Sequence, residues 1–262
     1  MDPFWLRIVA SFTVAGVWIG AATIVSERCG SKVGGLIVNL PSNIVTSFIF
    51  ITLTQSLAFT ASAARAVPVG MAINNFVMLL FMLGVRRGIG GATALAFAGW
   101  IAMVLLAHTA GLPGWKLGSL LFLISVIVVF FLMERGLGLR TQSPRRVRYS
   151  AAQVASRMVF AGSVVAVSVI LAHSAGPYWA GLFSTFPAVM MSTLVILSLA
   201  QGPAFAGGVA KVLVLSSANI LAFALVAEVA YPRVGLLAGT VLAYGAAVLW
   251  VVLLRPLVAK IS

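Results

Sequence analysis

The sequence predicts an all-α, polytopic membrane protein with about nine transmembrane helices, arranged as two inverted four-helix repeats joined by a linker helix. The first observation behind this prediction is composition. Of the 262 residues, 62% are hydrophobic and 8% are charged, whereas soluble chains carry about 25% charged residues. The second observation is an internal sequence match, and the third is a basic segment that separates the two matching copies. One aqueous core could not bury so much apolar surface.

The apolar runs define the predicted spans. A helix needs about 20 apolar residues to cross the hydrocarbon core. The runs are too long and too little alternating to be strands, and an open sheet edge is excluded from lipid. The nine predicted spans cover residues 4–26, 33–55, 58–84, 88–108, 115–133, 151–173, 177–199, 203–229 and 232–254.

The internal match lies at the second and seventh spans. Residues 34–59 superpose on residues 180–205 without a gap, at a shift of 146 residues. The identical pairs are Gly35 with Gly181, Leu36 with Leu182, Pro41 with Pro187, Leu53 with Leu199, Gln55 with Gln201, Ala58 with Ala204 and Phe59 with Phe205. Apolar composition alone would give fewer identities, so we interpret the match as a duplication.

The duplication predicts how the chain is organised. A first repeat covers residues 1–110, a linker helix with a basic cytoplasmic loop covers 111–150, and a second repeat covers 151–262. Arg7 at the first span matches Arg157 at the sixth, which extends the repeat to its first helix. Because one linker span separates the copies, the second copy crosses the membrane in the opposite direction.

The cations predict the orientation. The chain carries a net charge of +13. Twelve cations fall on the side of the 135–150 loop and four on the other side, so the N-terminus is expected outside and the C-terminus in the cytoplasm. We expect the 135–150 loop to contact anionic lipid head groups. No basic and aromatic surface stands apart from the spans, so no nucleic-acid partner is predicted.

The two matched prolines mark a candidate substrate path. Proline inside a span frees backbone carbonyls, and interrupted helices in matching positions of inverted halves point to a binding site. The surrounding polar residues are Asn39, Ser42, Asn43, Thr46 and Ser47 in one copy, and Ser184, Thr185, Ser192 and Thr193 in the other. The alternative is that these hydroxyls only satisfy the kink and allow close helix packing.

Three charged residues were also candidates for function. Arg65 and Lys211 are equivalent under the repeat, and two cations facing one cavity would favour an anionic solute. The alternative for both is snorkelling to the interface. Glu228 could couple protons, or it could pair with Arg233 at the outer boundary.

The second copy carries a pattern of small and aromatic residues that consists of Tyr178, Ala180-Gly181-Leu182, Phe186-Pro187, Gly202, Tyr231 and Trp250. In this pattern it resembles the GlpM family of small bacterial inner-membrane proteins. The first copy departs from the pattern, with Leu40 before Pro41 and Ser56 in place of the glycine. The resemblance implies an inner-membrane location and a four-helix unit, and it carries no functional residue to this chain.

These patterns predict a transporter or permease for a small solute, with its site between the repeats near the two prolines. The alternatives are a non-transporting accessory or assembly protein, a lipid translocator and an intramembrane enzyme. An enzyme is disfavoured because the four carboxylates are unpaired in the sequence. His108 and His173 form no metal motif. We therefore predict no metal, no cofactor and no catalytic residue.

Overall fold

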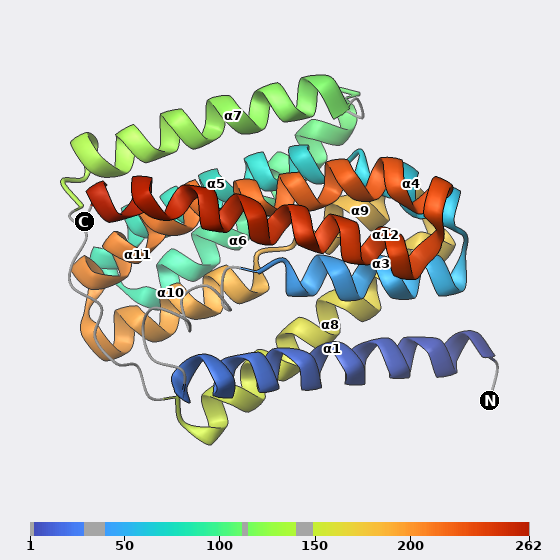
Figure 1. Ribbon diagram of the computed structural model, residues 1–262. Helices are drawn as coiled ribbons and strands as arrows, with labels where there is room; N and C mark the ends of the chain where they lie inside the picture. The colour runs from blue at the N-terminus through green and yellow to red at the C-terminus, as the bar shows by residue number, and fades with distance from the viewer. Residues whose placement is uncertain (1–2, 29–39, 112–114, 140–148, 262) are drawn as a thin grey trace.

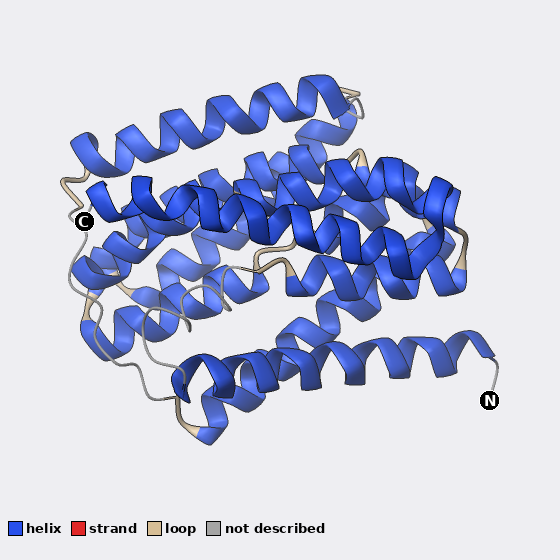
Figure 2. Cartoon of the chain, in the orientation of Figure 1, coloured by secondary structure: helices blue, strands red, loops and turns tan. Residues whose placement is uncertain are grey.

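The computed structural model describes residues 3–28, 40–111, 115–139 and 149–261, and this part of the chain is helical between short turns, with no strand (Figures 1 and 2). Seven stretches of it are long and apolar enough to cross a membrane. The prediction of an all-α, polytopic membrane protein is thereby confirmed. The helices in chain order are α1 (Pro3–Arg28), α3 (Ser42–Thr54), α4 (Leu57–Ala64), α5 (Val67–Gly84), η1 (Val85–Arg87), α6 (Ile89–Thr109), α7 (Trp115–Phe131), η2 (Leu132–Gly136), α8 (Ala151–Ser174), α9 (Pro177–Ser184), α10 (Ala188–Gln201), α11 (Pro203–Ser216) and α12 (Ala218–Ile261).

The number of qualifying stretches differs from the nine predicted spans for two reasons. The second predicted span begins in residues 29–39, outside the described residues, and its described part is the 13-residue helix α3. The eighth and ninth spans lie in one stretch of 52 residues, Pro203–Leu254. Helix α12 doubles back within that stretch at Gly235, whose φ of 82° is open to glycine at little steric cost. Figure 1 shows its two arms running antiparallel.

Glycine followed by proline sets both ends of the α9–α10 segment. Gly176 and Gly202 have φ values of 88° and 87°, and each precedes a proline in the first turn of the next helix. Glycine allows the chain to reverse there, and proline has the φ of a helix start without needing an amide partner. This pairing separates the sixth, seventh and eighth predicted spans with almost no loop.

Helix α5 lies at the centre of the bundle and α7 at its edge. In the most apolar window of Val67–Arg87, 72% of residues are buried, against 28% for Trp115–Gly136. The outer helices expose large apolar side chains, such as Leu237 and Val241 on the second arm of α12. An apolar exterior around a polar-containing centre is the arrangement that lipid favours.

Helices α1 and α8, the first helices of the two copies, pack against each other. They run in opposite directions in Figure 1. Small residues allow the close approach: a methyl group on Gly162 would lie 2.6 Å from the Phe12 carbonyl oxygen, and one on Gly16 would lie 3.0 Å from that of Met158. Phe12 and Gly162 become equivalent positions when Arg7 is superposed on Arg157.

Candidate functional site

The two matched prolines adopt nearly the same backbone conformation. Pro41 has φ −75° and ψ 51°, and Pro187 has φ −77° and ψ 37°. After each proline, the next amide donates back across it: Ser42 to the Leu40 carbonyl at 2.7 Å, and Ala188 to the Phe186 carbonyl at 2.8 Å. This geometry is close to that of an inverse γ-turn. Each turn immediately precedes a helix, α3 in one copy and α10 in the other.

A third helix interruption lies at Ser217, between α11 and α12. The Ser217 amide still donates to the Leu213 carbonyl at 2.9 Å, and its hydroxyl donates to the Val214 carbonyl at 2.6 Å. A serine hydroxyl that bonds back to the preceding turn competes with the helix and bends it. The interruption therefore occurs without a proline.

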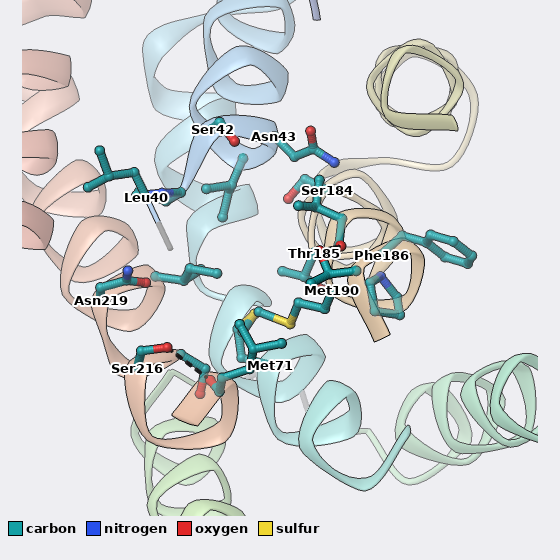
Figure 3. Close-up of a pocket in the computed structure, with 18 residues that line it drawn as sticks. Leu40, Ser42, Asn43, Met71, Ser184, Thr185, Phe186, Met190, Ser216 and Asn219 are labelled. Atoms are coloured by element: carbon teal, nitrogen blue, oxygen red, sulfur yellow. Dashed lines mark hydrogen bonds between the residues drawn. The ribbon is translucent and has the colours of Figure 1, made fainter. Parts of the chain in front are cut away.

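All three interruptions border one cavity, shown in Figure 3. The volume accessible to water is about 60 Å³. Its polar lining consists of Ser42, Asn43, Ser184, Thr185, Thr193, Ser216, Ser217 and Asn219, and its apolar lining consists of Leu40, Pro41, Ile44, Met71, Phe186, Pro187, Val189, Met190, Leu213 and Ile220. Six lining residues belong to the first copy and twelve to the second, so both copies contribute to the cavity wall.

Three helix N-termini meet at the cavity. Asn43 and Ile44 belong to the first turn of α3, Val189 and Met190 to that of α10, and Asn219 and Ile220 to that of α12; all six line the cavity. The helix dipole is positive at this end. Within the first turns, the amides of Ser42, Ala188 and Ile220 donate to the carbonyls of Leu40, Phe186 and Ser217. The C-terminal ends of α9 and α11 also reach the lining. None of the described lining residues is ionisable.

Several of the lining hydroxyls already donate hydrogen bonds to backbone carbonyls. Ser184 donates to the Gly181 carbonyl at 2.6 Å, Thr185 to the Leu182 carbonyl at 2.6 Å, and Thr193 to the Val189 carbonyl at 2.7 Å. By contrast, the side-chain oxygen of Asn43 is buried and has no hydrogen-bond partner. An amide can both donate and accept, so Asn43 has unused hydrogen-bonding capacity at the cavity wall. Figure 3 shows it at the edge of the cavity beside Ser184.

Two buried asparagines of α5 form hydrogen bonds near the helix interruptions of the second copy. Asn74 donates its side-chain amide to the Thr185 carbonyl, which is at the end of α9 in the other copy. Asn75 donates to the Ser125 hydroxyl at 2.9 Å and lies 3.4 Å from the Ser217 hydroxyl. A carbonyl freed inside a membrane span is costly unless it is hydrogen-bonded. The central helix thus stabilises the broken helices of the second copy.

The structure brings most of the predicted substrate-path residues together. Seven of them line the cavity: Pro41, Ser42, Asn43, Ser184, Thr185, Pro187 and Thr193. Thr46, Ser47 and Ser192 are close in sequence to lining residues but are not part of the lining. Thr46 and Ser192 donate to backbone carbonyls of their own helices. Asn39 and most of the 135–150 loop lie outside the described residues.

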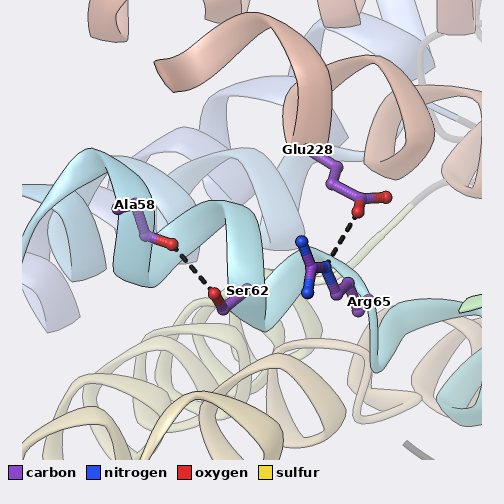
Figure 4. A network of polar contacts seen from close by, with 4 residues as sticks. All are labelled: Ala58, Ser62, Arg65 and Glu228. Atoms are coloured by element: carbon purple, nitrogen blue, oxygen red, sulfur yellow. Dashed lines mark hydrogen bonds and ion pairs between the residues drawn. The ribbon is translucent and has the colours of Figure 1, made fainter. Parts of the chain in front are cut away.

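The expectation that Arg65 and Lys211 face a common cavity is not met. Arg65 is 54% exposed and donates to Glu228 at 2.9 Å (Figure 4). Lys211 lies on α11 and is buried, with its ammonium 5.6 Å from the ring centre of Phe130. The sequence-equivalent cations differ because the third spans break at different places. Arg65 lies at the α4–α5 break, whereas α11 continues past Lys211 to Ser216.

Glu228 likewise lies apart from the cavity lining. Its ion-pair partner is Arg65, and not Arg233, its alternative partner in the sequence analysis. Ser216 and Ser217 were not among the predicted site residues, although they line the cavity. The signal for them was weak: a pair of serines inside an apolar span.

Comparisons with known proteins leave the family open. No protein-family model, no curated protein and no solved structure matches this chain. The resemblance to the GlpM family therefore stays a prediction from the residues that carry it.

Proposed function

We propose that this chain is a membrane transporter or permease for a small solute, and that the solute binds in the cavity between the two copies. The observation that carries the proposal is the meeting of the Pro41 and Pro187 turns, far apart in the sequence, at one polar cavity. Interrupted helices whose ends converge between inverted halves are a recurrent way of building substrate sites in transporters.

The cavity limits the size and chemistry of the solute. A water molecule needs about 10–15 Å³ of accessible volume, so the cavity has room for roughly four waters or for a solute of a few non-hydrogen atoms. Three helix N-termini and the C-terminal ends of α9 and α11 border it, and no ionisable side chain of the described lining does. Backbone amides at helix N-termini favour negative charge. We therefore propose a small anion as the favoured class of solute.

The proposal includes an orientation. The excess of cations on the side of the 135–150 loop supports a cytoplasmic C-terminus and an extracytoplasmic N-terminus. The resemblance to the GlpM family supports the bacterial inner membrane as the location. A non-transporting accessory protein would need no polar cavity between its halves, and a packed apolar interface would serve it better.

The test is solute entry into proteoliposomes. Purified protein is reconstituted, and swelling is followed by light scattering in iso-osmotic solutions of neutral, cationic and anionic solutes of a few non-hydrogen atoms, such as urea, ethanolamine and formate. We expect swelling with at least one small solute, fastest among the anions. Ser42→Phe fills the cavity from its half-buried edge and should remove this swelling.

The matched control is Ser156→Phe on the exposed face of α8, where the added ring meets no cavity. It should swell like the unmodified protein. Two results would contradict the proposal: no solute enters vesicles that contain correctly folded protein, or the Ser42→Phe protein swells as fast as the control.

A further inference from the structure

Arg157 is a buried cation directly behind the wall of the cavity. It lies on α8, its side chain is 3% exposed, and its Nη1 donates to the Thr193 hydroxyl at 3.0 Å. Thr193 lines the cavity. On its other side, the guanidinium lies 5.3 Å from the ring centre of Tyr149. From the sequence, Arg157 was expected to be one of the cations that set the orientation and the match of Arg7 in the repeat.

No carboxylate among the side chains that the structure describes pairs with Arg157: of these side chains, Arg65 and Glu228 form the only ion pair. The Nε of Arg157 is buried and has no hydrogen-bond partner. A buried charge without an opposite charge nearby is costly, and a guanidinium can only donate hydrogen bonds. An anion nearby would lower this cost.

Thr193 lies between the Arg157 guanidinium and the cavity. Its hydroxyl accepts from Arg157 and donates to the carbonyl of Val189, a residue in the first turn of α10. The cation therefore holds the hydroxyl in a fixed position next to a helix N-terminus. The positive end of the helix dipole and the guanidinium act on the cavity with the same sign.

The other buried cation of the described chain does not share this position. Lys211 is 2% exposed and packs over Phe130 of α7. Among the described residues, it makes no hydrogen bond to the cavity lining. It has the same charge and similar burial. Lys211 is therefore a matched control for the position of Arg157.

We propose that Arg157 is a positioning residue whose charge, held behind Thr193 in the cavity wall, makes the cavity selective for small monovalent anions, such as halide or formate. The proposal for Arg157 rests on the proposed function, which places the solute in this cavity, and it specifies the class of solute as a small monovalent anion. An anion in contact with Thr193 would stand about 6 Å from the guanidinium. At an effective dielectric constant of about 20, Coulomb's law gives roughly a 100-fold effect on affinity, so we expect removal of the charge to weaken anion binding at least tenfold.

The first experiment measures binding and does not depend on transport. Thermal unfolding of the purified protein is followed at constant sodium concentration while sodium gluconate, whose anion exceeds the cavity, is replaced by sodium formate. Formate should raise the unfolding temperature of the unmodified protein in a saturable way. Arg157→Met should lose this rise, whereas Arg157→Lys, which keeps the charge, and Lys211→Met should retain it. No rise in the unmodified protein, or an equal rise in Arg157→Met, would overturn the proposal.

The second experiment measures charge selectivity in planar bilayers from the reversal potential in a potassium formate gradient. The anion-to-cation permeability ratio should fall at least tenfold in Arg157→Met and stay near the original value in Arg157→Lys and Lys211→Met. An unchanged ratio in Arg157→Met would overturn the proposal. If the protein binds formate in the first experiment but carries no current and admits no solute, the proposed function fails while the anion site stands.

Discussion

Gly181 provides a direct test of how closely the two copies pack beside the cavity. Gly181 lies on α9 and faces the backbone of α4 in the other copy. A methyl group at this position would lie 2.7 Å from the carbonyl carbon of Ala63, and closer still to its oxygen. Because the opposing atoms belong to the backbone, no side-chain rotation can relieve the overlap. Gly181→Ala must push α9 and α4 apart.

The size of the effect follows from this distance. Ordinary contacts of a Cβ atom begin at 3.4 Å. The helices must therefore separate by at least about 0.7 Å to clear the carbonyl carbon and by more to clear its oxygen, and a gap of 0.5–1 Å already forfeits a quarter to a half of the dispersion energy of each contact. Overpacking in a tight interior costs about 1–3 kcal/mol. The higher helix propensity of alanine returns up to about 1 kcal/mol. We expect a net loss of about 1–2 kcal/mol in the free energy of unfolding.

The assay is reversible unfolding of the purified protein in mixed micelles by added dodecyl sulfate, followed by tryptophan fluorescence. The control is Gly91→Ala in α6, where a methyl group would meet nothing within 4 Å. The control should be as stable as the unmodified protein or slightly more stable, because it gains propensity without a clash. Equal stability of the two variants would refute the close packing of α9 against α4.

Three further predictions concern the interior. Asn74→Leu should lower the free energy of unfolding by about 1 kcal/mol in the same assay, since the Thr185 carbonyl loses its donor; no loss would mean that this bond is not formed. Glu228→Gln should leave the rate and the pH dependence of solute entry unchanged, because the carboxylate pairs with Arg65 apart from the cavity; a lost pH dependence would restore a coupling role. Pro187→Ala should slow solute entry into proteoliposomes, since a new amide donor favours a continuous α9–α10 helix; an unchanged rate would argue against a function for the turn.

The fold was largely predictable because lipid imposes simple rules on the sequence. Span length and apolar composition located the helices, and the two prolines located two of the three interruptions at the cavity. The interruption at Ser217 was not predicted, because serine hydroxyls bend helices only weakly and carry little signal. The turn at Gly235 was expected slightly earlier, before Arg233, but the helix continues through Pro232 until glycine provides the positive φ.

The charged residues were the least predictable part of the site. Sequence equivalence suggested that Arg65 and Lys211 have equivalent positions, yet the third spans of the two copies break at different residues and separate their roles. Arg157 was counted as a loop cation, although it lies inside the sixth predicted span. Whether a cation on a span faces lipid, water or a cavity depends on tertiary packing, to which a single sequence gives little access.

The most direct test of the inverted duplication is the side of the membrane on which Ala58 and Ala204 are found. These residues are equivalent in the two copies and both are exposed, next to the ends of α3 and α10 that lie at opposite ends of the bundle in Figure 1. With Cys29, the only cysteine of the chain, replaced by serine, single cysteines are introduced at each position. A membrane-impermeant maleimide should label Ala58→Cys in intact cells and Ala204→Cys only after the cells are opened. Labelling of both from the same side would contradict the account.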